Sequence, residues 1–264
     1  MKTFVIREKC FKNKINYGNF FKKFFSFNIY NTLVNLEIKF SSDFLDLYIE
    51  DNVFENINEL KAIEYLKLES LRFKSNFILK LNNIKKLHLF FCKNISLFGD
   101  YYNLKELNLK FNKMEKSNTL IKCPNIEICK INYFFKHCLL FDFTSFTKLK
   151  ELKTQLYDIL YLKNTSLNKI HIASDSFSTI DMEMKVLEKL ILINTLEEIK
   201  IELRDINNDE ISKIKDCNYN VKKLIIKLLH YNKNKCILFN LQKLFPNLYY
   251  IKIDAGFNEL KKQI

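Results

Sequence analysis

The sequence predicts a curved solenoid of α/β repeats, in which each repeat adds one strand to a parallel inner sheet and returns along an outer wall. Two observations support this prediction. The pattern apolar-x-x-apolar-x-apolar recurs from Leu33 onward, and most steps between Ile63 and Leu187 are 18 to 23 residues long. Within each pattern, apolar and polar residues alternate as in a strand with one buried face. A period of this length with one strand per unit is typical of stacked repeats.

The clearest repeat unit is LKELNLKFN, residues 104–112, in which three apolar residues stand at positions one, four and six and an asparagine at position nine. The sets of residues that occupy positions one, four and six are Leu33-Leu36-Ile38, Ile63-Leu66-Leu68, Ile84-Leu87-Leu89, Leu104-Leu107-Leu109, Ile126-Cys129-Ile131, Leu149-Leu152-Thr154, Leu167-Ile170-Ile172, Leu187-Leu190-Leu192, Leu196-Ile199-Ile201, Val221-Leu224-Ile226 and Leu248-Ile251-Ile253. We therefore expect about ten inner strands.

At these residues the chain resembles the leucine-rich repeat family, whose unit is Leu-x-x-Leu-x-Leu-x-x-Asn/Cys. The resemblance covers roughly residues 31–254, with degenerate repeats. It implies that the side chain at position nine bonds to the backbone of the loop after each strand. That position is filled as in the family by Asn112 and Cys92, whereas the other units have Ser41, Leu71, Phe134, Tyr157 or Asp175 there.

The predicted domain organisation is an N-terminal capping segment, residues 1–30, followed by one continuous solenoid domain, residues 31–264. In the stretch FFKKFF, a helix would place the rings of Phe20, Phe21, Phe24 and Phe25 on one side and two lysines on the other. We interpret this helix as part of a cap that covers the open end of the stack. The alternative is a helix that lies on a membrane surface.

Leu187 and Leu196 are only nine residues apart, which leaves no room for a parallel crossover between two inner strands. The Asn-Thr that precedes Leu196 also introduces other units, so we assign Leu196 to the inner sheet and Leu187 to a strand of the outer wall. The 20-residue step from Leu167 favours the opposite assignment.

The outer wall is predicted from the segments between the inner strands. Residues 77–81, 141–143 and 180–184 alternate apolar and polar residues and are expected to form short strands. Residues 208–216 and 238–245 have helical spacing, so helices should replace these strands near the C-terminus.

The composition is basic, with a net charge of +13 and a pI near 9.2, and contains only 3 glycines and 2 prolines. This bias indicates an AT-rich genome, so part of the lysine excess reflects codon usage rather than a charged partner. The N-terminal apolar run is too short for a signal peptide, and no stretch is long enough to span a membrane. The 7 cysteines include no Cys-x-x-Cys pair, and we expect reduced thiols in a cytoplasmic protein.

No catalytic motif is present, and three glycines cannot build a phosphate-cradling loop. His88 and His171 both stand at position five but four units apart, about 19 Å, which is too far for one metal ion. We therefore expect no enzyme activity, no cofactor and no metal site.

Position five of each unit should point out of the concave face. The candidate binding face at this position comprises Lys67, His88, Asn108, Lys130, Lys153, His171, Lys200 and Lys252. After Glu37 this column contains no acid, which indicates either a basic track or simply the abundance of lysine. We expect a non-enzymatic interaction protein that binds a protein partner, possibly acidic, on this face. The alternative is binding of nucleic acid or another polyanion, which would be sensitive to salt.

Overall fold

The computed structural model describes residues 2–7, 21, 23–24, 32–40, 49, 55–110, 121–132, 141–163, 166–174, 179–204, 208–229, 237–255 and 258–263. The chain divides into two compact units. Unit 1 comprises Met1–Ile126 and Lys130–Phe146, and unit 2 comprises Glu127–Cys129 and Thr147–Ile264.

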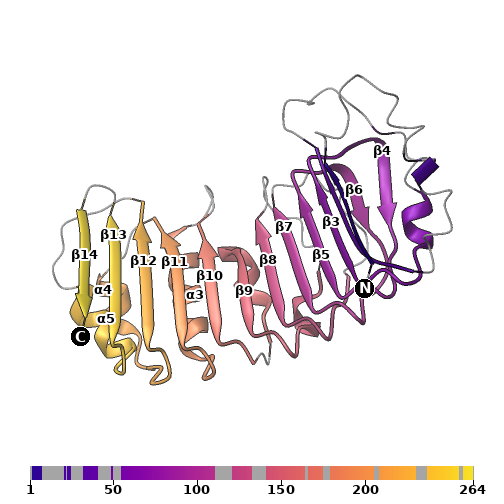
Figure 1. Ribbon diagram of the computed structural model, residues 1–264. Helices are drawn as coiled ribbons and strands as arrows, with labels where there is room; N and C mark the ends of the chain where they lie inside the picture. Colours follow the sequence, from indigo (N-terminus) through magenta and orange to yellow (C-terminus); the bar gives the residue numbers. More distant parts are fainter. Residues whose placement is uncertain are drawn as a thin grey trace. The chain divides into compact units, whose positions relative to one another are not determined.

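In unit 1, successive repeats contribute neighbouring parallel strands to one sheet (Figure 1). In spatial order these strands are β1 (Lys2–Arg7), β2 (Leu33–Lys39), β3 (Tyr65–Glu69), β5 (Lys86–Phe90) and β7 (Glu106–Lys110). The residues of β8 (Ile128–Asn132) are divided between the two units.

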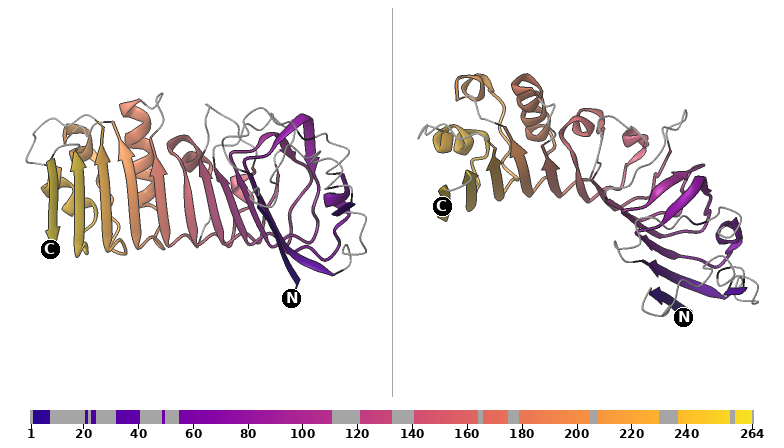
Figure 2. Two further views of the ribbon diagram at one scale, coloured as in Figure 1. Left: turned by 45° about the horizontal axis from the view of Figure 1, so that its top comes forward. Right: turned by 90° about the horizontal axis from the view of Figure 1, so that it is seen from above.

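Unit 2 continues the same scheme with five parallel strands, β9 (Glu151–Gln155), β10 (Lys169–Ala173), β11 (Glu198–Leu203), β12 (Lys223–Leu228) and β13 (Tyr250–Ala255). A final strand, β14 (Asn258–Gln263), pairs with β13 in the antiparallel sense. Figure 2 shows that the helices of unit 2 lie on one face of these strands. The prediction of a parallel α/β repeat sheet with one strand per repeat is confirmed.

The core of each unit is built from positions one, four and six of the repeats, which are buried almost throughout. In β3, for example, Leu66 and Leu68 are fully buried, while Tyr65, Lys67 and Glu69, which alternate with them, are partly exposed. Thr154 is the polar exception at position six. Its hydroxyl donates a hydrogen bond to the buried carboxylate of Asp158, so that the pair satisfies itself within the core.

The outer wall of unit 1 contains a second, two-stranded parallel sheet of β4 (Arg72–Leu79) and β6 (Lys93–Leu97), together with the 3-10 helices η3 (Glu55–Glu59) and η4 (Phe143–Ser145). The outer strand expected at residues 77–81 is therefore present up to Leu79. The strand expected at 141–143 is wrong. Phe141 forms only an isolated bridge with Ile121, and η4 starts at Phe143 because Asp142 caps it by accepting from the Thr144 amide.

The outer wall of unit 2 is helical, with the 3-10 helix η5 (Leu156–Tyr161) and the helices α3 (Ile180–Ile191), α4 (Asn208–Lys213) and α5 (Ile237–Leu244). Helices expected within residues 208–216 and 238–245 are confirmed. Leu196 does precede the inner strand β11, as expected.

The outer strands expected at residues 180–184 and at Leu187 are wrong, because both segments belong to α3. The apparent alternation over five residues gives way to a longer helical pattern, in which Glu183, Val186, Leu187, Leu190 and Ile191 share the buried face. The start of the helix is fixed by a cap at Thr179, whose hydroxyl accepts from the Met182 amide. The Asn218 side chain closes the other end, donating to the carbonyl oxygen of Ile193 at 2.9 Å.

The N-terminal segment adds β1 to the sheet of unit 1, a strand that the sequence did not predict. Within the aromatic stretch, Phe21 and Phe24 are helical and buried, whereas Lys23 is exposed. The Phe24 ring lies 4.6 Å from that of Phe4, and the Phe21 ring lies 6.3 Å from that of Phe40. These two rings belong to the core of unit 1. Phe20, Lys22 and Phe25 lie outside the described residues.

A ladder of side-chain hydrogen bonds joins successive repeats at the turn before seven of the inner strands. In this turn ladder, the residue just before position one donates to a backbone carbonyl of the preceding repeat, as Asn103 does to Asn82 at 3.0 Å. The other donors and acceptors are Asn83 to Lys61, Asn125 to Tyr102, Ser166 to Leu149, Thr195 to Leu167, Asn220 to Asn194 and Asn247 to Tyr219. These seven repeats are therefore tied to the preceding repeat by polar as well as apolar contacts.

Candidate binding faces

The face of the strands opposite the outer wall carries positions three, five and seven of each repeat, and we call it the open face of each unit. The structure divides the candidate residues between the two units. Lys67, His88 and Asn108 are direct partners on β3, β5 and β7 of unit 1. Lys130 lies on β8. The remaining candidates, Lys153, His171, Lys200 and Lys252, lie on β9, β10, β11 and β13 of unit 2.

The open face of unit 1 has an aromatic centre, the Tyr65–His88–Phe90 cluster. The Tyr65 ring meets the His88 ring edge-on, with 5.4 Å between centroids and an interplanar angle of 86°. On its other side, the His88 ring stacks with Phe90 at 5.8 Å and 24°. All three residues are partly exposed, so the cluster forms an apolar patch that solvent reaches.

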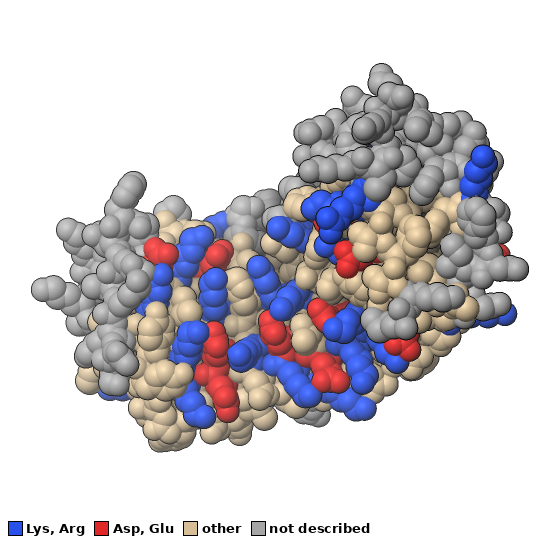
Figure 3. All heavy atoms as spheres, in the orientation of Figure 1, with Lys and Arg blue, Asp and Glu red and all other residues tan. Residues whose placement is uncertain are grey.

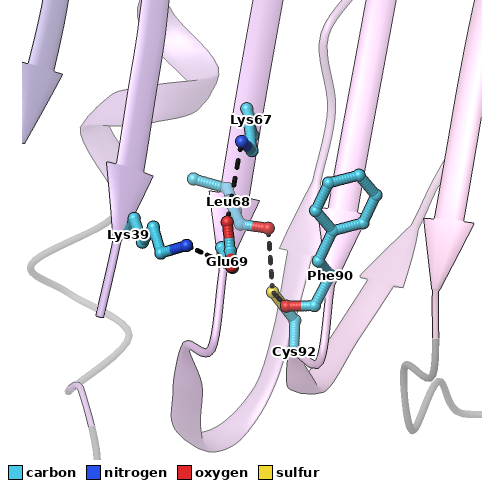
Figure 4. A network of polar contacts seen from close by, with 6 residues as sticks. All are labelled: Lys39, Lys67, Leu68, Glu69, Phe90 and Cys92. Carbon is cyan, nitrogen blue, oxygen red and sulfur yellow. Dashed lines mark hydrogen bonds and ion pairs between the residues drawn. The ribbon is translucent and has the colours of Figure 1, made fainter. Parts of the chain in front are cut away.

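Charged side chains surround the cluster in ion pairs. One carboxylate oxygen of Glu106 lies 3.0 Å from the His88 ring, in a hydrogen bond. The other oxygen lies 3.1 Å from the ammonium group of Lys86, in an ion pair. On the other side, Glu69 lies 2.8 Å from Lys39 and 3.6 Å from Lys67, whose ammonium group is also 5.6 Å from the centroid of Phe90 (Figure 4). Each of these three lysines is thus within ion-pair distance of a carboxylate.

Burial and these pairs set the protonation states at the centre. Burial lowers the pKa of His88 despite its hydrogen bond to Glu106, so the imidazole is neutral at pH 7. Burial alone would raise the pKa of Glu106, but the hydrogen bonds from Lys86 and His88 lower it, and the carboxylate stays ionised. Burial, the nearby charge of Glu37 and a hydrogen bond to that carboxylate raise the pKa of Tyr65 to about 12.

The open face of unit 2 carries interleaved lysines and acids (Figure 3). Glu198 on β11 lies 3.0 Å from Lys223 and 3.9 Å from Lys169, which stand on the two flanking strands. Glu202, at the other end of β11, lies 3.4 Å from Lys227. Opposite charges at position three therefore pair with one another across neighbouring strands, and so do opposite charges at position seven.

Position five is different, because its lysines stand between these paired columns. Lys153, His171 and Lys200 face each other in direct register on β9, β10 and β11. Burial, then Lys200, then Lys153 lower the pKa of His171 to about 4. Its Nε2 atom is buried and has no hydrogen-bond partner among the described residues. A neutral imidazole thus separates two ammonium groups.

The structure describes four of the seven cysteines, all as free thiols. Cys92, Cys123 and Cys129 are buried, and Cys217 is partly exposed. The Cys92 thiol lies 3.5 Å from the carbonyl oxygens of Leu68 in β3 and Phe90 in β5, to which it donates (Figure 4). Cys10, Cys138 and Cys236 lie outside the described residues, as do Asn112, His137 and His230.

No protein-family model, curated protein or solved structure matches the chain. The assignment of a function therefore depends on the open faces themselves. Over the part of the chain that the structure describes, no group of three or more His, Cys, Asp or Glu side chains is arranged to hold a metal ion. Nor does any helix in that part combine the length and apolar character that crossing a bilayer requires.

Position five alone does not identify the residues at positions three and seven, which share its face of the strand. Tyr65 and Glu106 stand at position three and Phe90 at position seven. Tyr65 and Phe90 form the aromatic centre with His88, and Glu106 is hydrogen-bonded to the His88 ring. A signal was present, because positions three, five and seven of a strand share one face. Comparing all three columns would have placed two aromatic residues beside His88.

Proposed function

We propose that this chain is a leucine-rich-repeat-type interaction protein without enzyme activity, which binds a protein partner through the open face of unit 1. The observation that carries this proposal is the partly exposed Tyr65–His88–Phe90 cluster inside a ring of paired charges. Protein interfaces combine an apolar, often aromatic, centre with a polar rim, and a few aromatic residues supply most of the binding energy.

The same geometry favours a protein over a polyanion. A nucleic acid is held mainly by lysines and arginines that neutralise its phosphates. Here Glu69 and Glu106 hold Lys39, Lys67 and Lys86, so phosphates would have to displace these carboxylates and would be repelled by them. A protein surface with its own mixture of charges can instead complement the rim.

The test compares the proteins that different variants capture from native cell extract, quantified by mass spectrometry. In the test variant, Tyr65→Ser and Phe90→Ser remove two rings of the cluster. In the matched control, Phe98→Ser and Tyr102→Ser remove two rings of unit 1 that are 56% and 58% exposed but stand outside the open face. We expect one or more proteins to be captured by the wild type and by the control, and to be lost from the test variant.

Equal capture by both variants would contradict the assignment of the open face. Capture that disappears after nuclease treatment, or that falls steeply between 50 and 200 mM salt, would favour the polyanion alternative instead. Circular dichroism of each variant verifies that the fold is retained.

A further inference from the structure

The structure arranges charge along position five of unit 2 with a regular spacing. Lys153, Lys200 and Lys252 stand on β9, β11 and β13, and the uncharged residues His171 and Ile225 stand between them on β10 and β12. All five side chains are partly exposed. We call these five residues the lysine row.

The lysines of this row recur on every second strand. Neighbouring strands lie about 4.8 Å apart, so successive lysines are separated by about 9.6 Å. The two residues between them do not compensate their charge, because Ile225 is apolar and His171 is neutral at pH 7. Lys153 and Lys200 both lie close enough to His171 to lower its pKa, as does Lys227, while Glu202 acts in the opposite direction.

The two carboxylates that flank Lys200 in its own strand are engaged by other lysines. Glu198 and Glu202, on either side of Lys200 in β11, pair with Lys169, Lys223 and Lys227 of the neighbouring strands. Among the described residues, no carboxylate lies within ion-pair distance of Lys200 itself. The ammonium group of Lys200, the middle lysine of the row, is therefore available to pair with a negatively charged group of a ligand.

We propose that the lysine row binds an acidic peptide segment in the polyproline II conformation, with a carboxylate at every third residue. Polyproline II has three residues per turn and rises about 3.1 Å per residue, so every third side chain points the same way at intervals of about 9.3 Å. This interval matches the spacing of the lysines. The peptide backbone between successive carboxylates would then pass over the neutral side chains of His171 and Ile225.

Other backbone conformations fit the row less well. Side chains on one face of a β-strand repeat at about 6.6 or 13 Å, which misses every second lysine. An α-helix returns to the same face after seven residues, about 10.5 Å, but its diameter of about 10 to 12 Å would bring it against the flanking carboxylates. Positions three and seven of a strand are about 13 Å apart, so Glu198 and Glu202 confine the ligand to a narrow track. The same two carboxylates repel the continuous charge of a nucleic acid strand.

This inference rests on the proposed function of the chain as a protein-binding protein, but it concerns a different face and is tested separately. The probe is a fluorescein-labelled peptide with three Glu-Pro-Pro repeats, titrated at 50 mM salt and followed by fluorescence anisotropy. Two control peptides replace each Glu by Gln, or keep three Glu residues but separate them by three prolines. We expect the Glu-Pro-Pro peptide to bind more tightly than either control.

The protein variant Lys153→Met, Lys200→Met and Lys252→Met removes the charges of the row and keeps most of the side-chain volume. Each lysine lost should weaken binding roughly two- to fivefold, so the triple variant should bind about 8- to 125-fold more weakly. The matched control, Lys163→Met, Lys185→Met and Lys215→Met, removes three exposed lysines outside the open face of unit 2 and should bind as the wild type does.

Equal loss in the two triple variants, or equal affinity for the two spacings of glutamate, would overturn the proposal. So would tighter binding of an oligothymidine of the same charge that also depends on the row. The variant Tyr65→Ser with Phe90→Ser should bind the peptide normally. A failure of the lysine row is thereby distinguished from a failure of the aromatic centre in unit 1, which affects only the capture experiment.

Discussion

Acidification should destabilise the protein through His171, and the structure gives the sign and size of the effect. In the folded chain, burial and two lysines lower the pKa of His171 to about 4, whereas an unfolded histidine titrates near 6.5. Between these values the unfolded state binds more protons, so the stability contributed by the neutral ring is present above pH 6.5 and is lost as the pH falls toward 4. The full shift would cost about 1.8 kcal/mol between pH 7 and pH 5. Because the ring is partly exposed, solvent screening reduces this to about 1 kcal/mol.

The assay is urea unfolding, followed by far-ultraviolet circular dichroism at pH 7 and pH 5, of the wild type and of His171→Gln. Glutamine is polar and close in size but does not titrate in this range, so other titrating groups, including His88 and Glu106, contribute equally to both proteins. The wild type should lose about 1 kcal/mol more than the variant on going from pH 7 to pH 5. Equal losses in the two proteins would refute the assignment of a neutral, desolvated imidazole at this position.

Three further predictions concern single contacts. Lys200→Met should raise the pKa of His171, measured by NMR of the ring protons, although burial should still keep this pKa below 6.5. An unchanged pKa would show that the Lys200 ammonium group does not act on the ring. Asn83→Ala removes a rung of the turn ladder and should lower the free energy of unfolding by about 1 kcal/mol, whereas Asn82→Ala next to it should change it by less than about 0.5 kcal/mol. Burial raises the pKa of the Cys92 thiol to about 12, so iodoacetamide at pH 8 should modify it only after denaturation.

The inner strands could be predicted from the sequence because every repeat has the same pattern of apolar residues. Apolar residues at positions one, four and six must be buried together, and a period-two pattern in a short unit allows only a strand. The minimum length of a parallel crossover excludes two inner strands nine residues apart, and the Asn-Thr before Leu196 indicates that this unit is the inner one. Both constraints can be read from the spacing of apolar residues in a single sequence.

The outer wall was harder to predict, because its segments are short and their patterns are compatible with more than one structure. The alternation at 180–184 resembled a strand, but the helical pattern from Glu183 to Ile191 and the cap at Thr179 decide the outcome. Similarly, Phe141 and Phe143 alternate correctly, yet Asp142 turns the chain into a 3-10 helix. Such local capping bonds outweigh a pattern of three to five residues.

The candidate site was predicted in part. Position five supplied His88 and the lysine row, because the register of a parallel repeat follows directly from the spacing. The aromatic centre required knowing that Tyr65 and Phe90, on different strands, both contact His88. The ion pairs also depend on neighbouring strands, since Glu198 reaches lysines that are distant in sequence.

The turn ladder also determines where the chain can tolerate changes in length. The donor and acceptor of a rung are 17 residues apart in one repeat and 28 residues apart in another. In every rung the donor nevertheless stands just before position one, and the acceptor lies in the corresponding turn of the preceding repeat. The connecting segment on the outer wall can therefore be a strand, a 3-10 helix or an α-helix without disturbing the rung. Segments inserted into these connections, such as an epitope tag or a small folded module, should leave the open faces intact. A single residue inserted into the turn would break the rung and shift the next strand out of register, so the repeats are expected to vary in length only along the outer wall.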